Sequence, residues 1–146
     1  MFTNGSAAAV RYGRELAWLF VSLAVYTVIT ALYFSPLLAH LDSQLLGPPE
    51  DNLQDLWNLW HVVSGGVSGD TFFFTRAIRF PEGTSLAYHS IAYPEVYFAL
   101  PFAKALGATL PTLITVENLT ILASFPLAGV GAFYLARHFV GNAPVT

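Results

Sequence analysis

The chain has 146 residues, of which 55% are hydrophobic and only 10% are charged, and its mean hydropathy is +0.56. Soluble domains contain roughly 25% charged residues, so this composition indicates an integral membrane protein. The lack of cysteine excludes a disulfide framework and a thiolate metal site, and a net charge of −3 without a basic run argues against a nucleic-acid partner.

The first element is a long uncharged segment that follows the N-terminal residues 1–15. Residues 16–35 carry no charge over 20 positions, which is about the length that crosses a hydrocarbon core of roughly 30 Å. The sequence therefore predicts a transmembrane helix over residues 16–38. Arg11 and Arg14 precede it, so the positive-inside rule places the N-terminus in the cytoplasm. The alternative is a cleaved signal peptide, whose apolar region is only about 7–15 residues long.

Residues 39–113 are predicted to form an extracytoplasmic loop, because Lys and Arg accumulate on the cytoplasmic side of membranes and this segment is mainly acidic. Its acids are Asp42, Glu50, Asp51, Asp55, Asp70, Glu82 and Glu95, and its bases are Arg76, Arg79 and Lys104. Within the loop, residues 80–86 are predicted to turn, with Pro81 at the entry and Gly83 available for a positive φ.

A short amphipathic helix is predicted over residues 51–63, where apolar side chains recur at helical spacing. Asp51 followed three residues later by Gln54 matches a reciprocal helix cap. Trp57 and Trp60 fall on the apolar side, as tryptophans do when a helix lies along a membrane surface. We therefore expect this helix to lie flat on the bilayer.

The polar side of this helix carries the candidate catalytic groups. Asp51, Asp55 and Asn58 stand at i, i+4 and i+7, so they form one stripe that we expect to face water, with His61 beside it. Glu50 places another carboxylate next to these acids. Neighbouring negative charges raise the free energy of the site unless the carboxylates share a proton or bind a cation. Asp51 is either a helix cap or a functional acid, and Asp55 is either a solvated residue or a second acid of the site.

Two further apolar segments complete the prediction of an all-α membrane protein. Residues 91–106 have an uncharged stretch of only eight residues, too short to span, so a second membrane-surface helix is predicted over 94–106, with a third transmembrane pass as the alternative. A second transmembrane helix is predicted over 114–137. Arg137 at its end places the tail, residues 138–146, in the cytoplasm together with the N-terminus.

The second predicted span has a face made of small residues. Ser124, Ala128, Ala132 and Ala136 repeat every four residues and would let another helix approach closely. The alternative is that membrane helices are generally rich in such residues. The favoured interpretation is a packing face for other transmembrane helices.

Basic and imidazole groups are scattered through the loop. Arg76 and Arg79 stand three residues apart and are candidates for binding a phosphate, with lipid-headgroup contacts as an equal alternative. His61 and His89 are isolated histidines, for which hydration is the favoured interpretation over metal ligation. The sequence predicts no metal site from these residues.

The order of these parts is similar to that of a known family. The helix from Asp51 to Trp60, the turn from Phe80 to Leu86 and a helix ending at Tyr134 to His138 together resemble the N-terminal module of polytopic GT-C type glycosyltransferases, in an uncharacterised prokaryotic branch. The resemblance covers residues 15–141. It implies sugar transfer from a polyprenyl-phosphate donor on the extracytoplasmic side of a prokaryotic inner or cytoplasmic membrane.

The resemblance also implies roles for individual residues. The family's acid falls on Asp51, with Asp55 or Glu50 as a second group. Such a carboxylate takes a proton from the acceptor hydroxyl, while a cation or arginine stabilises the departing phosphate. Arg76 and Arg79 are the arginines available for that role, His61 is a further substrate-binding candidate, and a divalent cation is the candidate cofactor.

The predicted chain has far fewer spans than members of that family. Two transmembrane helices cannot enclose a pocket for a lipid-linked sugar, so we expect this polypeptide not to be catalytic by itself. The alternative function is that of a non-catalytic accessory subunit, packed through its small-residue face against a larger membrane complex. In either case the expected partners are the lipid bilayer and other transmembrane helices.

Overall fold

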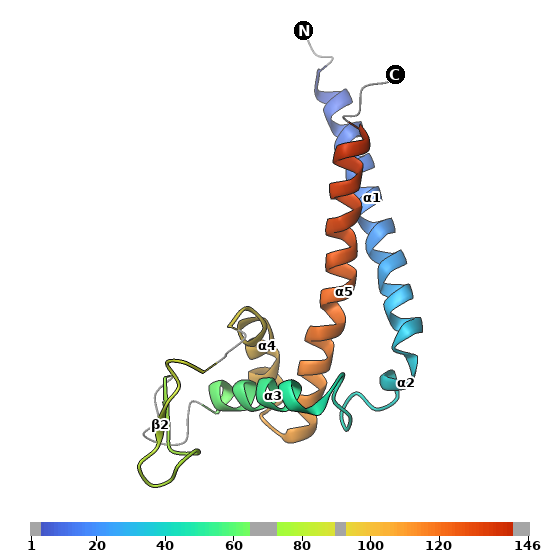
Figure 1. Cartoon of the computed structure of the whole chain (residues 1–146). Coiled ribbons are helices and arrows are strands. Elements are labelled where there is room, and N and C mark those ends of the chain that lie inside the picture. Colours follow the sequence, from blue (N-terminus) through green and yellow to red (C-terminus); the bar gives the residue numbers. More distant parts are fainter. Residues whose placement is uncertain (1–3, 65–72, 90–92, 142–146) are drawn as a thin grey trace. The chain divides into compact units, whose positions relative to one another are not determined.

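The computed structural model describes residues 4–64, 73–89 and 93–141, and these are mostly helical. The helices are α1 (Asn4–Tyr33), α2 (Ser35–Leu38), α3 (Pro49–Val63), α4 (Tyr93–Leu106) and α5 (Leu110–Gly141). A small antiparallel sheet pairs β1 (Phe74–Thr75) with β2 (Thr84–Ser85), as Figure 1 shows. The chain forms two compact units, the first made of Met1–Ser35 with Leu122–Thr146 and the second of Pro36–Ile121.

The first unit is a pair of antiparallel helices, α1 and the C-terminal part of α5 (Figure 1). Gly129 makes their close approach possible, because a Cβ at this position would lie 2.5 Å from Cγ of Tyr26. Aromatic pairs add contacts along the seam, with ring centroids 6.1 Å apart for Trp18 and Phe133 and 5.0 Å apart for Phe34 and Phe125. The predicted packing face lies elsewhere on α5.

Both long helices, α1 and α5, expose apolar side chains that no other part of the described chain covers. Tyr12–Tyr33 and Leu110–Val140 are long and apolar enough to cross a membrane, and only 6% of either span window is buried. A buried core helix would show the opposite pattern. A helix satisfies its own backbone hydrogen bonds, so an uncovered apolar helix of this length suits hydrocarbon better than water.

The helix boundaries differ from the predicted ones at several ends. α1 begins at Asn4 rather than near residue 16 and ends at Tyr33, with the short α2 continuing to Leu38. α5 is longer than the predicted 114–137, because Gly107, at a φ of 92°, ends α4 and leaves room for α5 to begin at Leu110. α4 agrees closely with the predicted 94–106.

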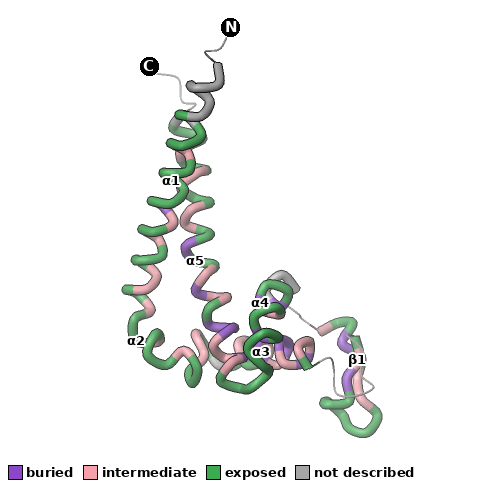
Figure 2. Tube along the Cα trace, turned by 180° about the vertical axis from the view of Figure 1, so that it is seen from behind, coloured by how far each residue is buried: buried purple, intermediate pink, exposed green. Residues whose placement is uncertain are grey.

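The second unit has a small core where α3, α4 and the first turns of α5 meet, which Figure 2 shows as the buried segments. The core residues are Leu56, Leu59, Ala99, Ala103, Leu113 and Val116. Full burial of a leucine such as Leu59 stabilises the folded state by about 1.5–3 kcal/mol. The alanines of α4 lie at i and i+4, so α3 packs closely over that face of α4.

Asn118 fastens the segment after α2 to α5 within this unit. Its Nδ2 donates to the carbonyls of Leu41 and Gln44, and its Oδ1 accepts the backbone N–H of Leu46. The side chain is fully buried and its neighbour Glu117 is 2% exposed. The Asn118 amide therefore has a structural role, since its oxygen and nitrogen are already occupied by these hydrogen bonds.

The β-hairpin includes the turn predicted over residues 80–86. Gly83 has a φ of 77°, as predicted, and a Cβ there would lie 2.7 Å from the carbonyl oxygen of Thr75. Arg79 also has a positive φ, of 59°. After β2 the chain is anchored by Leu86, which is 2% exposed and donates its N–H to the carbonyl of Phe73.

Candidate functional site

The site is built on α3, whose start differs from the predicted cap. Pro48 occupies the N-cap position in an extended conformation and no side chain caps the helix, so the predicted Asp51 and Gln54 capping pair was wrong. Proline has no backbone N–H, so a proline in the first turn leaves one fewer donor that a capping side chain would have to satisfy. Asp51 and Glu50 instead lie in the first turn as exposed carboxylates, where the helix dipole favours negative charge.

The polar stripe of α3 is only partly open to water. Asp51 is exposed and Asp55 is half-buried, whereas Asn58 and His61 are 1% and 2% exposed. The prediction that the whole stripe faces water was therefore wrong at its C-terminal end. The reason is tertiary, because the segment after β2 brings His89 onto this part of α3.

Three side chains form a hydrogen-bonded row at that place. His89 Nε2 lies 2.8 Å from Oδ1 of Asn58, and Asn58 in turn hydrogen-bonds the carboxylate of Asp55. Neutral Asn58 thus separates an imidazole from a carboxylate. This arrangement lets the two titratable groups influence each other without forming a direct ion pair.

Burial is the main reason why the pKa of Asp55 is raised above its ordinary value. The hydrogen bond from Asn58 lowers the pKa, the charge of Asp51 raises it, and the charge of His89 lowers it. A carboxyl group with a raised pKa gives up its proton less readily than an exposed aspartate. Asp51 and Asp55 therefore present two carboxyl groups in different environments on one helix.

Trp57 forms the centre of this cluster. Its ring stacks on His61 with a centroid distance of 5.1 Å and an interplanar angle of 5°. It meets His89 edge to face at 5.6 Å. Nδ1 of His61 is buried and has no hydrogen-bond partner among the described residues. The two imidazoles are thus held by the same indole.

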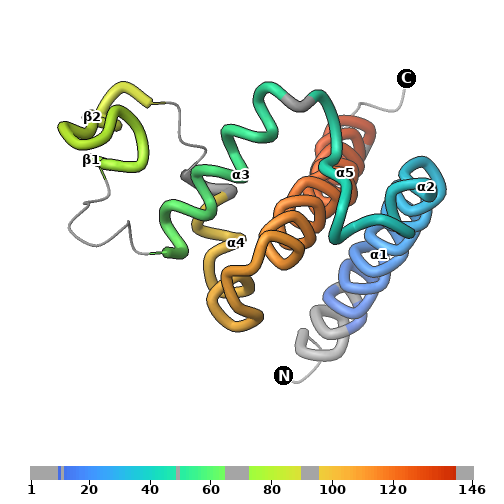
Figure 3. Tube along the Cα trace, turned by 90° about the horizontal axis from the view of Figure 1, so that it is seen from below, coloured from blue at the N-terminus to red at the C-terminus, as the bar shows by residue number. Residues whose placement is uncertain are grey.

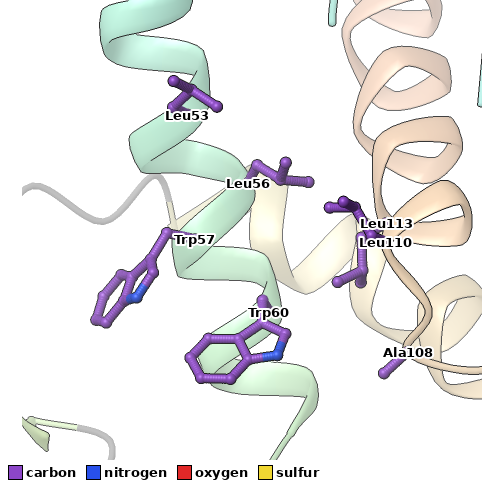
Figure 4. Close-up of a pocket in the computed structure, with 7 residues that line it drawn as sticks. All are labelled: Leu53, Leu56, Trp57, Trp60, Ala108, Leu110 and Leu113. Carbon is purple, nitrogen blue, oxygen red and sulfur yellow. The ribbon is translucent and has the colours of Figure 1, made fainter. Parts of the chain in front are cut away.

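Trp57 is also one of the residues that line an apolar cavity of about 330 Å³ (Figure 4). It is lined by Leu53, Leu56, Trp57, Trp60, Ala108, Leu110 and Leu113, which come from α3 and from the segment that starts α5. The rings of Trp57 and Trp60, which were expected to lie along a membrane surface, line this cavity of the second unit. Figure 3 shows α3 and α4 crossing in this unit.

The remaining predicted site residues lie on other elements. Arg76 and Arg79 are exposed in the loop between β1 and β2, where the Arg76 guanidinium lies 5.8 Å from the centre of the Phe74 ring. Ser124, Ala128, Ala132 and Ala136 all lie on the exposed surface of α5. In the parts of the chain that the structure describes, no group of three or more His, Asp or Glu side chains is arranged to hold a metal ion.

Sequence reasoning did not assign His89 to the site. A single histidine in a loop has no periodicity, and only the fold of the β-hairpin places it against Asn58. The chemistry available at the cluster is proton exchange by carboxyl and imidazole groups beside an apolar cavity.

No protein-family model matches the chain, and no curated protein or solved structure shows significant similarity to it.

Proposed function

We propose that this chain is a membrane module that presents a carboxylate site on the extracytoplasmic side, as the acceptor-side part of a GT-C type glycosyltransferase with a polyprenyl-phosphate sugar donor. The observation that carries the proposal is the difference between two acids one helical turn apart. Asp51 is exposed and is not consumed as a helix cap, whereas burial raises the pKa of Asp55.

In the proposed reaction, Asp51 is the general base. It takes the proton of an acceptor hydroxyl as that oxygen attacks the anomeric carbon of the sugar. A new C–O bond forms, the bond between the anomeric carbon and the phosphate oxygen breaks, and the phosphate leaves with the electron pair. Arg76 or Arg79, exposed on the β-hairpin, supplies positive charge for the departing phosphate.

The membrane placement is part of the same proposal. α1 and α5 cross the bilayer, and Arg11 and Arg14 hold the start of α1 on the cytoplasmic side. Arg137, at the end of α5, adds to this asymmetry even though Glu15 pairs with it, because acidic residues count little in the positive-inside rule. The orientation therefore rests on the arginines at the start of α1 and at the end of α5.

The test measures sugar transfer in native membranes that contain the protein, with radiolabelled polyprenyl-phosphate hexoses as donors. Asp51→Asn should lower turnover by about 100-fold or more, since a general base contributes roughly that factor. Asp42→Asn is the matched control, because Asp42 is an exposed aspartate outside α3. An Asp51→Asn variant with the turnover of the wild type would remove Asp51 as the base.

A second candidate function is that of an accessory subunit, and one observation favours it. The small residues Ser124, Ala128, Ala132 and Ala136 are exposed, while α1 packs at Gly129. That face is consequently available to a helix from a partner. Ala128→Leu with Ala132→Leu should reduce co-purification of a partner from native membranes. Isolation of the wild-type chain alone would exclude this function.

A further inference from the structure

His89 and Asn58 are oriented in a way that gives their hydrogen bonds a direction. Oδ1 of Asn58 faces Nε2 of His89 at 2.8 Å, so the imidazole donates and the amide oxygen accepts. The amide Nδ2 of Asn58 is then the group that donates to Asp55, since a carboxylate can only accept. Donation thus runs from His89 through Asn58 to Asp55.

The surroundings hold both members of this row in place. Asn58 is 1% exposed, so its amide has little freedom to turn over. The His89 ring packs edge to face on Trp57, and the backbone N–H of His89 donates to the carbonyl of Leu86, the buried anchor of the β-hairpin. The imidazole is therefore presented to α3 by a fixed piece of backbone.

We propose that His89 is a positioning residue for Asp55, acting through Asn58 to hold the carboxyl group in one orientation. This inference rests on the proposed function of the α3 acids and adds a residue from outside α3 to their site. The step involves no covalent change. His89 supplies a hydrogen-bond donor at all pH values in this tautomer and a positive charge when the ring is protonated.

The charged and titratable groups around Asp55 act in opposite directions. Asp51, on the same helix, opposes ionisation of Asp55, and His89, from the β-hairpin segment, favours it. The ring of His61 stacks on Trp57, and His61 is not among the groups that shift the pKa of Asp55. Removing His89 and removing Asp51 should consequently shift the titration of Asp55 in opposite senses.

The experiment is a ¹³C NMR titration of aspartate side chains in the whole protein in lipid nanodiscs, with the Asp55 signal assigned by Asp55→Asn. His89→Leu should raise the midpoint of Asp55, because both the donor and the charge are lost. His89→Gln keeps a donor near the Nε2 position and loses the charge, so its midpoint should lie between those of wild type and His89→Leu. Asp51→Asn should lower the midpoint.

The control is His40→Leu, since His40 is an exposed histidine of the same unit, and its Asp55 midpoint should equal that of the wild type. Unchanged midpoints in both His89 variants would overturn the proposal, as would equal midpoints for His89→Leu and His89→Gln. The measurement needs no catalysis, so it separates the two ideas. A shifted midpoint in His89→Leu, with full turnover in Asp51→Asn, would retain the role of His89 and reject the proposed base.

Discussion

Glu15 and Arg137 form a two-point ion pair that joins α1 to α5. The guanidinium donates Nη1 to Oε2 at 2.7 Å and Nη2 to Oε1 at 2.8 Å, the parallel geometry that suits a planar fork and a carboxylate. Tyr134 adds a hydrogen bond from its hydroxyl to the carbonyl of Glu15, and the guanidinium lies 5.8 Å from the centre of the Trp18 ring. These contacts connect α1 and α5 at one end of the first unit.

Breaking this pair should weaken the first unit modestly. The side chains are 34% and 37% exposed, so solvent screens the pair and we expect Arg137→Gln to cost about 0.5–1 kcal/mol. The measurement is the unfolding midpoint in mixed micelles titrated with a denaturing detergent. Glu82→Gln, at an exposed site on the β-hairpin, should leave the midpoint unchanged. A midpoint of Arg137→Gln equal to that of the wild type would show that the pair adds nothing to stability.

Two glycines two residues apart on α5 offer a sharper test of helix packing. A Cβ at Gly129 would lie 2.5 Å from Cγ of Tyr26, at the root of the ring where the side chain cannot easily move away, whereas a Cβ at Gly131 meets nothing within 4 Å. Gly129→Ala should destabilise the first unit by about 1–3 kcal/mol. Gly131→Ala should instead stabilise it by about 0.5–1 kcal/mol through the helix preference of alanine.

The same detergent titration compares the two variants. Identical midpoints for Gly129→Ala and Gly131→Ala would mean that α1 does not pack closely at Gly129. The comparison also bears on the small-residue face, because Ala128 and Ala132 flank these glycines in sequence and are exposed. Small residues on α5 thus serve two different faces, which spacing alone does not separate.

Some parts of this structure were predictable from the sequence because they depend on local patterns. Apolar spacing predicted a helix over residues 51–63, and α3 spans Pro49–Val63. Gly83 was expected to be available for a positive φ in the turn over residues 80–86, and its φ is indeed 77°. The burial of Asn58 and His61 was missed, since it depends on where the β-hairpin folds back, which no local pattern encodes.

Asn118 is a fully buried polar side chain that stabilises the second unit. It makes three hydrogen bonds to backbone groups of Leu41, Gln44 and Leu46, so Asn118→Ala would leave those groups unpaired in the interior. We expect a loss of about 2–4 kcal/mol in the stability of the second unit. Thr115→Ala is the control on the same helix, since the Thr115 hydroxyl bonds only the Pro111 carbonyl of its own turn.

Tryptophan fluorescence can follow this unit selectively. The chain has three tryptophans, and a Trp18→Phe background leaves Trp57 and Trp60, which both line the cavity of the second unit. Thermal unfolding in that background should show a lower midpoint for Asn118→Ala than for Thr115→Ala. Equal midpoints would show that the tie between Asn118 and the segment after α2 is not needed for stability.

The raised pKa of Asp55 makes a prediction about pH with a definite sign. The folded protein binds the Asp55 proton more tightly than the unfolded chain does, so ionisation of this group costs stability. That cost is absent at pH values below the ordinary Asp pKa of about 3.9 and is fully present above the raised pKa of the folded state. Asp55→Asn mimics the neutral form at every pH.

Asp55→Asn should therefore have the same unfolding midpoint as the wild type near the acidic end of this window and a higher midpoint at neutral pH. The fluorescence assay in the Trp18→Phe background measures both. Asp42→Asn, at an exposed site, should show no such divergence. If Asp55→Asn were less stable than the wild type at neutral pH, the bonds from Asn58 and the charge of His89 would outweigh burial, and the carboxylate would be a stabilising part of the fold. A gain in stability on removing the charge is what a functional acid held in an unfavourable environment produces.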